Sequence, residues 1–287
     1  MLYIKNDSHD PYFNQAFEEY VFEHLSLEED ILLLWINDPC LVCGRYQNLF
    51  QEVNLPEAER RGVPVIRRNT GGGTVYHDGG NLNYTMIRAR AADSPLDYDA
   101  FLTPVIEALN RMGIPAHKRH VCDIAIDGLK ISGSAQSVKS DRVLHHGTLL
   151  FNADLTNLRE LLCPMPGHME SKAVRSIPSP VTNIKGHAAE QPYETAAEFM
   201  EAFRRALMGQ NGLESTLSAD SKAAIERLSR EKYQTWDWTF GKGPKFLFTP
   251  AHTDIRLYVE RGIVVQCNKE KFIGLPADTV IKELTAI

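Results

Sequence analysis

The sequence contains few cysteines, and they form no pairing pattern. The 287-residue chain has five, of which only Cys40 and Cys43 lie close together, with two residues between them. An odd number at scattered positions does not make a disulfide framework, and a structural zinc site needs a second close pair. We expect Cys40 and Cys43 to be buried free thiols. This favours a reducing compartment, the cytoplasm or an organelle matrix.

Long hydrophobic runs and an excess of positive charge are also absent. The longest apolar stretches, such as residues 31–36, have the length of a strand, whereas a membrane-spanning helix needs about 20 apolar residues. The N-terminal residues lack the apolar core of a signal peptide. The net charge of −6 argues against a protein that coats nucleic acid, because such a protein needs a basic face. We therefore expect neither a membrane nor a nucleic acid as a partner.

Local patterns predict both strands and helices, without a regular βαβ order. This mixture favours an α+β fold, or a mixed-sheet α/β fold, over a Rossmann fold or a barrel. The patterns come from apolar spacing and from capping and turn residues. We expect strands at residues 31–36, 82–87 and 144–151, helices that begin at Pro11 and after Thr195, a helix at 99–112, and a hairpin at Asp127–Gly128.

Glycine and proline residues between 241 and 250 predict a domain boundary. We place a main domain at residues 1–248 and an appendage at 249–287. The appendage is too short for a core of its own, so it must pack on the main domain or on a partner.

A glycine-rich segment follows a predicted strand and is the first candidate for a ligand site. Arg67 and Arg68 precede the triplet Gly71–Gly73, and His77 and Asp78 come soon after. Glycines let the backbone approach a ligand, and successive amides can hold an anion. Arginine guanidinium groups suit phosphate or carboxylate. We interpret the segment as an anion site, although it is neither a Walker A loop nor a dinucleotide fingerprint.

Two further segments carry polar residues near predicted strands. Lys130 is followed by Ser132 and Gly133, small residues that leave space for a ligand beside the ammonium group. His145 and His146 are adjacent on a strand, so they point to opposite faces of a sheet. His146 is a candidate general base, but a hydrogen-bonded structural histidine is the favoured interpretation.

These segments, with others in the same order along residues 1–250, resemble the lipoate–protein ligase A family of the biotin/lipoate protein ligase superfamily. The glycine-rich segment resembles the family signature, and the segment after Asp123 resembles its lysine motif. The matching segments are residues 44–48, 67–81, 123 with 130–135, 146–150, 171–176, 181–183 and 236–241.

The resemblance implies a biotin/lipoate ligase-type fold and a reaction in two steps. Lipoate, or octanoate, attacks the α-phosphate of ATP in the presence of Mg²⁺ and forms an acyl-adenylate. The lysine of a lipoyl acceptor domain then takes the acyl group as an amide. The implied acceptors are the E2 component of 2-oxoacid dehydrogenases and the H protein of glycine cleavage.

The resemblance also implies a role for each matching residue. Lys130 is the catalytic residue, placed between the carboxylate and the α-phosphate, and Arg68 holds phosphate. Asp123 is a candidate ligand for magnesium. The ATP- and lipoate-binding residues are Arg68, Gly71, Gly72, Gly73, Thr74, Val75, Tyr76, His77, Asn81, Lys130, Ser132, Gly133, His146 and Thr148.

The sequence differs from the family pattern in two places, and two other functions remain open. Cys122 stands where the family commonly has asparagine, and the C-terminal accessory region is shortened. The first alternative is an octanoyl or lipoyl transferase that forms a thioester on Cys163, although that cysteine closes an apolar helix where a packed thiol is ordinary. The second is a lipoate-binding subunit that is inactive without a separate accessory protein.

Overall fold

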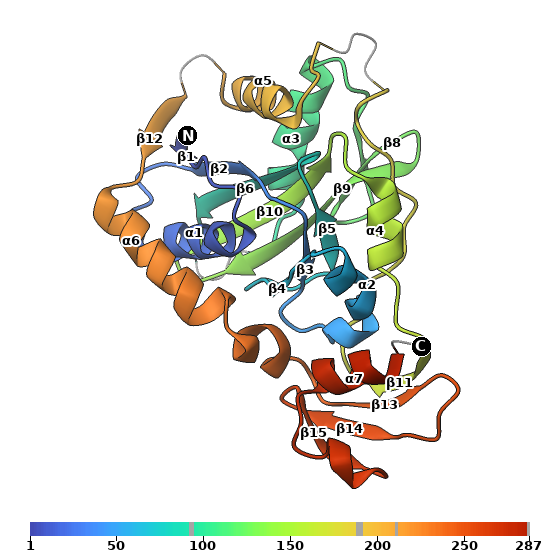
Figure 1. Cartoon of the computed structure of the whole chain (residues 1–287). Coiled ribbons are helices and arrows are strands. Elements are labelled where there is room, and N and C mark those ends of the chain that lie inside the picture. Colours follow the sequence, from blue (N-terminus) through green and yellow to red (C-terminus); the bar gives the residue numbers. More distant parts are fainter. Residues whose placement is uncertain (92–94, 188–191, 210–211, 286–287) are drawn as a thin grey trace. The chain divides into compact units, whose positions relative to one another are not determined.

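The computed structural model describes residues 1–91, 95–187, 192–209 and 212–285 (Figure 1). The chain divides into two units, each built from three segments. Unit 1 comprises Met1–Asp38, His77–Leu155 and Pro178–Arg227, and unit 2 comprises Pro39–Tyr76, Thr156–Ile177 and Leu228–Ile287.

Unit 1 is built on a mixed sheet, as the sequence predicts. β1 is parallel to both of its neighbours, and the remaining strand pairs of the sheet are antiparallel. In sheet order the strands are β12 (Leu213–Thr216), β1 (Leu2–Lys5), β2 (Ile31–Ile36), β6 (Asn81–Ala89), β10 (Arg142–Leu150), β9 (Leu129–Val138), β8 (Asp123–Ile126) and β7 (His117–Arg119).

Helices pack on both faces of this sheet. Tyr84 of β6 contacts Phe203 of α5, whereas its neighbour Thr85 bonds Glu18 of α1, so α1 and α5 lie on opposite faces. Figure 1 shows α3 beside α5 on one side of the sheet. The helices of the unit are α1 (Pro11–His24), α3 (Asp99–Arg111), α5 (Ala196–Met208) and α6 (Ala219–Leu228), the last of which ends one residue into unit 2.

The predicted helix starts and hairpin are confirmed. The Asp10 carboxylate accepts from the Tyr12 amide at the start of α1, and Thr195 forms a capping box at the start of α5. Asp127 and Gly128 turn between β8 and β9 with φ angles of 49° and 79°. Short-range hydrogen bonds therefore set these element boundaries.

The α3 and α5 side of the sheet buries an apolar cluster with a histidine packed against it. Phe101 of α3 and Phe203 of α5 belong to this cluster. The His145 ring stacks on Phe101 with centroids 4.9 Å apart, and Gln136 Nε2 lies 3.1 Å from its Nδ1. Burial, and to a lesser extent the nearby His146 and Arg88, lower the pKa of His145 to about 3. His145 is therefore neutral in the folded protein at ordinary pH.

Unit 2 contains two smaller sheets around a second apolar cluster. One sheet has the order β4 (Val65–Arg67), β3 (Cys40–Cys43) and β5 (Val75–His77), whose last residue belongs to unit 1. The other has β11 (Gly167–Ser171), β13 (Phe246–Pro250), β14 (Leu257–Glu260) and β15 (Ile263–Cys267). The helices are α2 (Leu55–Arg60), α4 (Leu155–Leu161, beginning in unit 1), α7 (Ala277–Thr285), 3-10 helices at Leu49–Gln51 and Glu270–Phe272, and π-helical turns at Ser229–Tyr233 and Asp237–Gly241.

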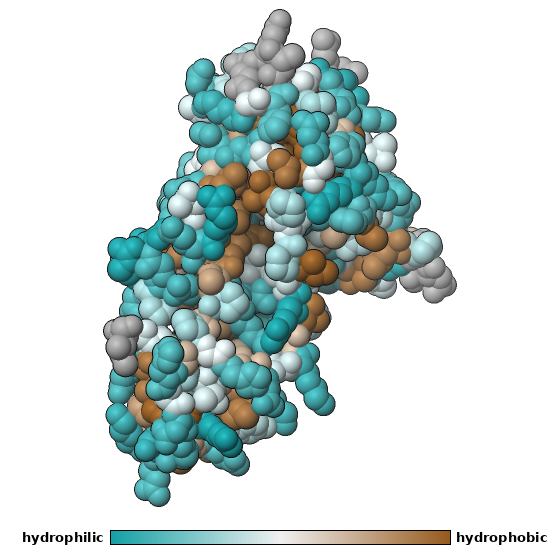
Figure 2. All heavy atoms as spheres, turned by 90° about the vertical axis from the view of Figure 1, so that its right-hand side faces the viewer, coloured by the Kyte–Doolittle hydropathy of each residue, from teal (hydrophilic) through white to brown (hydrophobic). Residues whose placement is uncertain are grey.

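Within unit 2, the C-terminal segment packs on earlier parts of the chain. Val280 and Ile281 of α7 are buried in the same cluster as Leu41 and Phe50. Trp236 Nε1 donates to Asp278 at 3.0 Å. On the face drawn in Figure 2, hydrophobic residues reach the surface in small groups among hydrophilic ones. In the described part of the chain, none of the helices is long and apolar enough to cross a membrane.

We predict that His145 makes the fold sensitive to acid. Its folded pKa lies below the unfolded value, so the unfolded state binds the proton first as the pH falls below about 6.5. The free energy of unfolding should then fall by up to about 1.4 kcal/mol per pH unit between pH 6 and 4 through this residue. His145→Phe should remove that part of the slope in urea titrations at several pH values.

The exposed His117 offers a matched control. His117→Gln should leave the pH dependence of the unfolding free energy as in the unchanged protein. An equally steep slope in His145→Phe would show that other groups cause the acid sensitivity.

Candidate active site

In unit 1 the structure brings together three of the predicted site residues around one ion pair. Lys130 Nζ lies 2.8 Å from Asp123 Oδ1, and the two side chains are 26% and 10% exposed. Gly133 leaves space for this pair, since a Cβ there would lie 2.8 Å from Lys130 Nζ. The Asp123 side chain is thus mostly buried, whereas the Lys130 side chain keeps part of its surface in solvent.

The backbone around Lys130 is held on both sides. Its amide donates to the Pro180 carbonyl at 3.0 Å, and its carbonyl accepts from the Thr182 amide at 3.0 Å. On the other side, the pairing of β8 with β9 has an irregularity that sets Lys130 opposite Ala125. Such bulges re-aim side chains within a sheet. Ser132, a predicted ligand residue two positions on, is almost fully buried.

His146 faces α1, and its neighbour His145 faces the opposite side of the sheet, as predicted from strand periodicity. His146 Nδ1 lies 2.8 Å from Glu18 Oε1. The same carboxylate oxygen accepts from the Thr85 hydroxyl at 2.5 Å. Glu18 is buried and orients the imidazole, a role that no local sequence pattern indicates. Thr148 lies two residues along β10, on the same face as His146.

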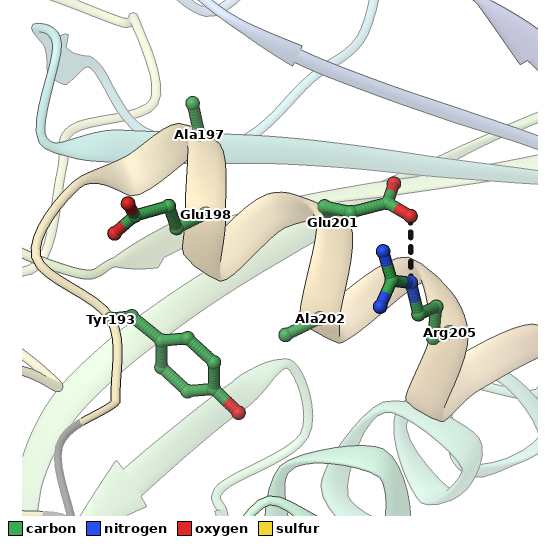
Figure 3. A pocket seen from close by; sticks show the side chains of 6 residues that line it. All are labelled: Tyr193, Ala197, Glu198, Glu201, Ala202 and Arg205. Atoms are coloured by element: carbon green, nitrogen blue, oxygen red, sulfur yellow. Dashed lines mark hydrogen bonds and ion pairs between the residues drawn. The ribbon is translucent and has the colours of Figure 1, made fainter.

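The two remaining predicted residues of unit 1 lie in buried amide networks. His77 Nδ1 lies 2.9 Å from Asn37 Nδ2, and Asn37 Oδ1 accepts from Asn14 at 2.8 Å. Asn81 Nδ2 donates to Asn83 Oδ1 at 3.3 Å. Figure 3 shows a separate surface hollow beside α5, lined by Tyr193, Ala197, Glu198, Glu201, Ala202 and Arg205. None of the predicted site residues lines it.

In unit 2, Arg67 does not have the ligand role expected for it. Its side chain is fully buried, and Nε donates to the Thr239 carbonyl at 3.0 Å. Nη1 donates to the carbonyls of Gly44 at 2.9 Å, Arg45 at 3.2 Å and Gln47 at 2.8 Å. Burial lowers the pKa of Arg67. Arg67 therefore ties loop backbones together, and its prediction as an anion-binding residue is wrong.

Arg68 lies among carbonyls of the glycine-rich loop itself. Its Nη2 donates to the Gly71 carbonyl at 2.6 Å and to the Gly73 carbonyl at 2.7 Å. Its Nη1 donates to the Val42 carbonyl at 3.0 Å. The guanidinium group thus holds these carbonyls toward Arg68. The loop amides are then free to face away from Arg68. Gly72 adopts a φ of 88°, which favours glycine.

The other loop residues are held from within the same unit. The Thr74 amide donates to Ser176 Oγ at 3.0 Å, and the Thr74 hydroxyl donates to Gln47 Oε1 at 2.8 Å. Val75 and Tyr76 continue into β5, where Tyr76 is buried. Gln47 and Ser176 were not singled out as site residues from the sequence, although they lie in segments that resemble family motifs.

The cysteines differ in burial. Cys40 and Cys43 are buried free thiols, as predicted. Cys163 is exposed rather than packed, and its thiol lies 3.7 Å from the Pro164 carbonyl. Burial raises the pKa of Cys122, whose thiol lies 3.7 Å from Asp123 Oδ1. Among the described residues, no three histidine, cysteine or acidic side chains are grouped to hold a metal ion.

Comparisons with known proteins agree with this arrangement. Residues 10–208 match the model of the lipoyl protein ligase A/B catalytic domain. A lipoate–protein ligase of Bacillus subtilis is 36% identical over 278 residues, which cover 93% of this chain and 83% of the relative.

Two solved structures share the fold. One belongs to a bi-partite lipoate protein ligase from Thermoplasma acidophilum, with a TM-score of 0.69, 22% identity, and coverage of 83% of this chain and 94% of that one. The other is a lipoate–protein ligase A bound with ATP, with a TM-score of 0.67, 23% identity, and coverage of 83% and 97%. The biotin/lipoate ligase-type fold expected from the sequence is confirmed. The chain belongs to the lipoyl protein ligase A/B catalytic domain family, and the relatives it matches are enzymes.

Proposed function

We propose that this chain is a lipoate–protein ligase that activates lipoate, or octanoate, with ATP and transfers the acyl group to a protein lysine. The observation that carries the proposal is the partly exposed ammonium group of Lys130, paired with buried Asp123 in a space left by Gly133. Membership of the ligase family supports the same chemistry.

The Lys130 ammonium group has enough N–H donors to bind one oxygen of each substrate in the first step. An ammonium group has three N–H donors, and one directed at Asp123 leaves two for substrates. One substrate oxygen belongs to the lipoate carboxylate and the other to the α-phosphate of ATP. The carboxylate attacks phosphorus, the bond to pyrophosphate breaks, and an acyl-adenylate forms. A fixed positive charge at this point reduces the repulsion between two anions and stabilises the charge that develops on phosphorus.

The second step uses the same electrostatic groups. The amine of the acceptor lysine attacks the acyl carbon, adenosine monophosphate leaves, and an amide forms. The ammonium group of Lys130 stabilises the departing phosphate. No covalent enzyme intermediate is required, which distinguishes this reaction from a thioester mechanism.

The remaining predicted residues bind substrates in this proposal. Arg68 contributes positive charge behind the glycine-rich loop, and in this proposal amides of that loop bind the nucleotide. The binding residues are Arg68, Gly71, Gly72, Gly73, Thr74, Val75, Tyr76, His77, Asn81, Lys130, Ser132, Gly133, His146 and Thr148. Asp123 would be one of the one or two protein carboxylates that hold a Mg²⁺ ion bound to the ATP phosphates.

Partners follow from the reaction class. The acceptors are lipoyl domains, with the E2 component of 2-oxoacid dehydrogenases and the glycine-cleavage H protein as candidates. In this proposal residues 1–248 form the catalytic domain and residues 249–287 form an accessory region. The five free cysteines fit a reducing compartment, the cytoplasm or an organelle matrix.

We predict that Lys130→Ala abolishes acyl-adenylate formation. Loss of one preorganised charge at the reacting phosphorus should reduce the rate by at least about 100-fold, and Lys130→Arg should retain part of it because the charge remains. Mass spectrometry of the adenylate formed from lipoate and Mg-ATP measures the effect. Circular dichroism should show an unchanged fold.

Lys118→Ala is the matched control, because Lys118 also pairs with an aspartate, Asp99, on an exposed part of unit 1. It should form the adenylate at the rate of the unchanged enzyme. An active Lys130→Ala variant would exclude the proposed role of Lys130.

We predict that acyl transfer needs ATP and does not need Cys163. Cys163→Ala should lipoylate an apo acceptor domain as fast as the unchanged enzyme, because no thioester forms. Cys267→Ala serves as a control for loss of a thiol elsewhere. Gel shift of the acceptor, with free lipoate plus Mg-ATP or with octanoyl carrier protein alone, measures the transfer. Transfer without ATP, or its loss in Cys163→Ala, would favour the transferase.

A further inference from the structure

In unit 2, one hydroxyl oxygen receives two hydrogen bonds at the glycine-rich loop. Ser176 Oγ accepts from the Thr74 amide at 3.0 Å and from Gln47 Nε2 at 3.1 Å. Gln47 is almost fully buried and also accepts from the Thr74 hydroxyl at 2.8 Å. A backbone amide and a fixed side-chain amide that converge on one oxygen form an arrangement that suits an anionic oxygen.

The loop is shaped to admit this hydroxyl. A Cβ on Gly73 would lie 2.9 Å from Ser176 Oγ, so a side chain there would displace it. The backbone amide of Ser176 donates to the buried carboxylate of Glu52 at 3.2 and 3.3 Å. Glu52 therefore anchors the residue whose side chain occupies the loop. Nothing in the local sequence predicts this contact, because Ser176 is about 100 residues from the loop.

We propose that the Ser176 hydroxyl holds the place of a nucleotide phosphate oxygen at the Thr74 amide and leaves it when the nucleotide binds. The inference rests on the proposed function, since it assigns the loop to ATP. Hydrogen bonds to a charged acceptor are about twice as strong as those to a neutral one. A phosphate oxygen can therefore replace the hydroxyl, which turns away from the Thr74 amide while Glu52 keeps the Ser176 backbone in place. Ser176 is a positioning residue at the Thr74 amide.

The contact lowers the affinity for nucleotide, because it must be broken first. Loss of the Ser176–Thr74 hydrogen bond should raise the affinity for nucleotide roughly five- to tenfold, which corresponds to the free energy of one neutral hydrogen bond. In Ser176→Ala the KM for ATP should fall by this factor while kcat stays unchanged. Ser176→Thr keeps the hydroxyl and should restore the original KM.

The matched control is Ser171→Ala, in the same segment. Ser171 Oγ accepts from the Ala173 amide, a bond within the segment. This variant should keep the original KM for ATP. An unchanged or higher KM in Ser176→Ala, or a lower kcat, would overturn the inference and show that Ser176 supports the loop rather than occupying its site.

A binding measurement separates this inference from the proposed function. Calorimetry with inorganic pyrophosphate needs no turnover, and Ser176→Ala should bind it about five- to tenfold more tightly than the unchanged protein. Equal affinities would overturn the placeholder role even if the enzyme makes acyl-adenylate. Tighter binding in an enzyme that makes no adenylate would support the role and contradict the ligase function.

Discussion

Backbone carbonyl groups that converge on two buried arginines determine the geometry of the loops in unit 2. Arg67 donates hydrogen bonds to carbonyls of the loop that begins at Gly44. Arg68 donates hydrogen bonds to carbonyls of the glycine-rich loop. A buried charge and buried carbonyls are each costly alone, and here the arginines donate to these carbonyls, although Nη2 of Arg67 has no hydrogen-bond partner among the described residues. The two loops approach so closely that a Cβ on Gly44 would lie 2.1 Å from the Gly72 carbonyl oxygen. The position of the Thr74 amide follows from this packing.

Unit 1 uses its positive charge differently. Lys130 is paired with one carboxylate, keeps part of its surface in solvent and lies beside a glycine. A fully buried arginine with carbonyl partners stabilises a loop, whereas a partly exposed lysine with unused donors can bind a substrate. The net charge of the chain contains no information about this difference. Substrate binding depends on which charged groups keep N–H donors that are not bonded within the protein after folding.

The sequence predicts those features that depend on neighbouring residues. The cap at Asp10, the turn at Asp127–Gly128 and the opposite directions of His145 and His146 follow from short-range geometry, and the structure agrees. Features that join distant segments could not be predicted. The contact of Glu18 with His146 spans 128 residues, and that of Ser176 with Thr74 spans 102.

Two expectations from the sequence are wrong, for different reasons. Arg67 looked like a ligand residue because its partners, the carbonyls around Gly44 and Thr239, lie far away in the sequence. The apolar pattern before Cys163 predicts a packed thiol, but the helix buries Leu161 and leaves the cysteine exposed.

The exchange of radioactive pyrophosphate into ATP by the unchanged enzyme tests the central claim, adenylate formation, most directly. The account predicts exchange only when lipoate or octanoate is present, whereas exchange without the acid, or none with it, would contradict adenylate formation.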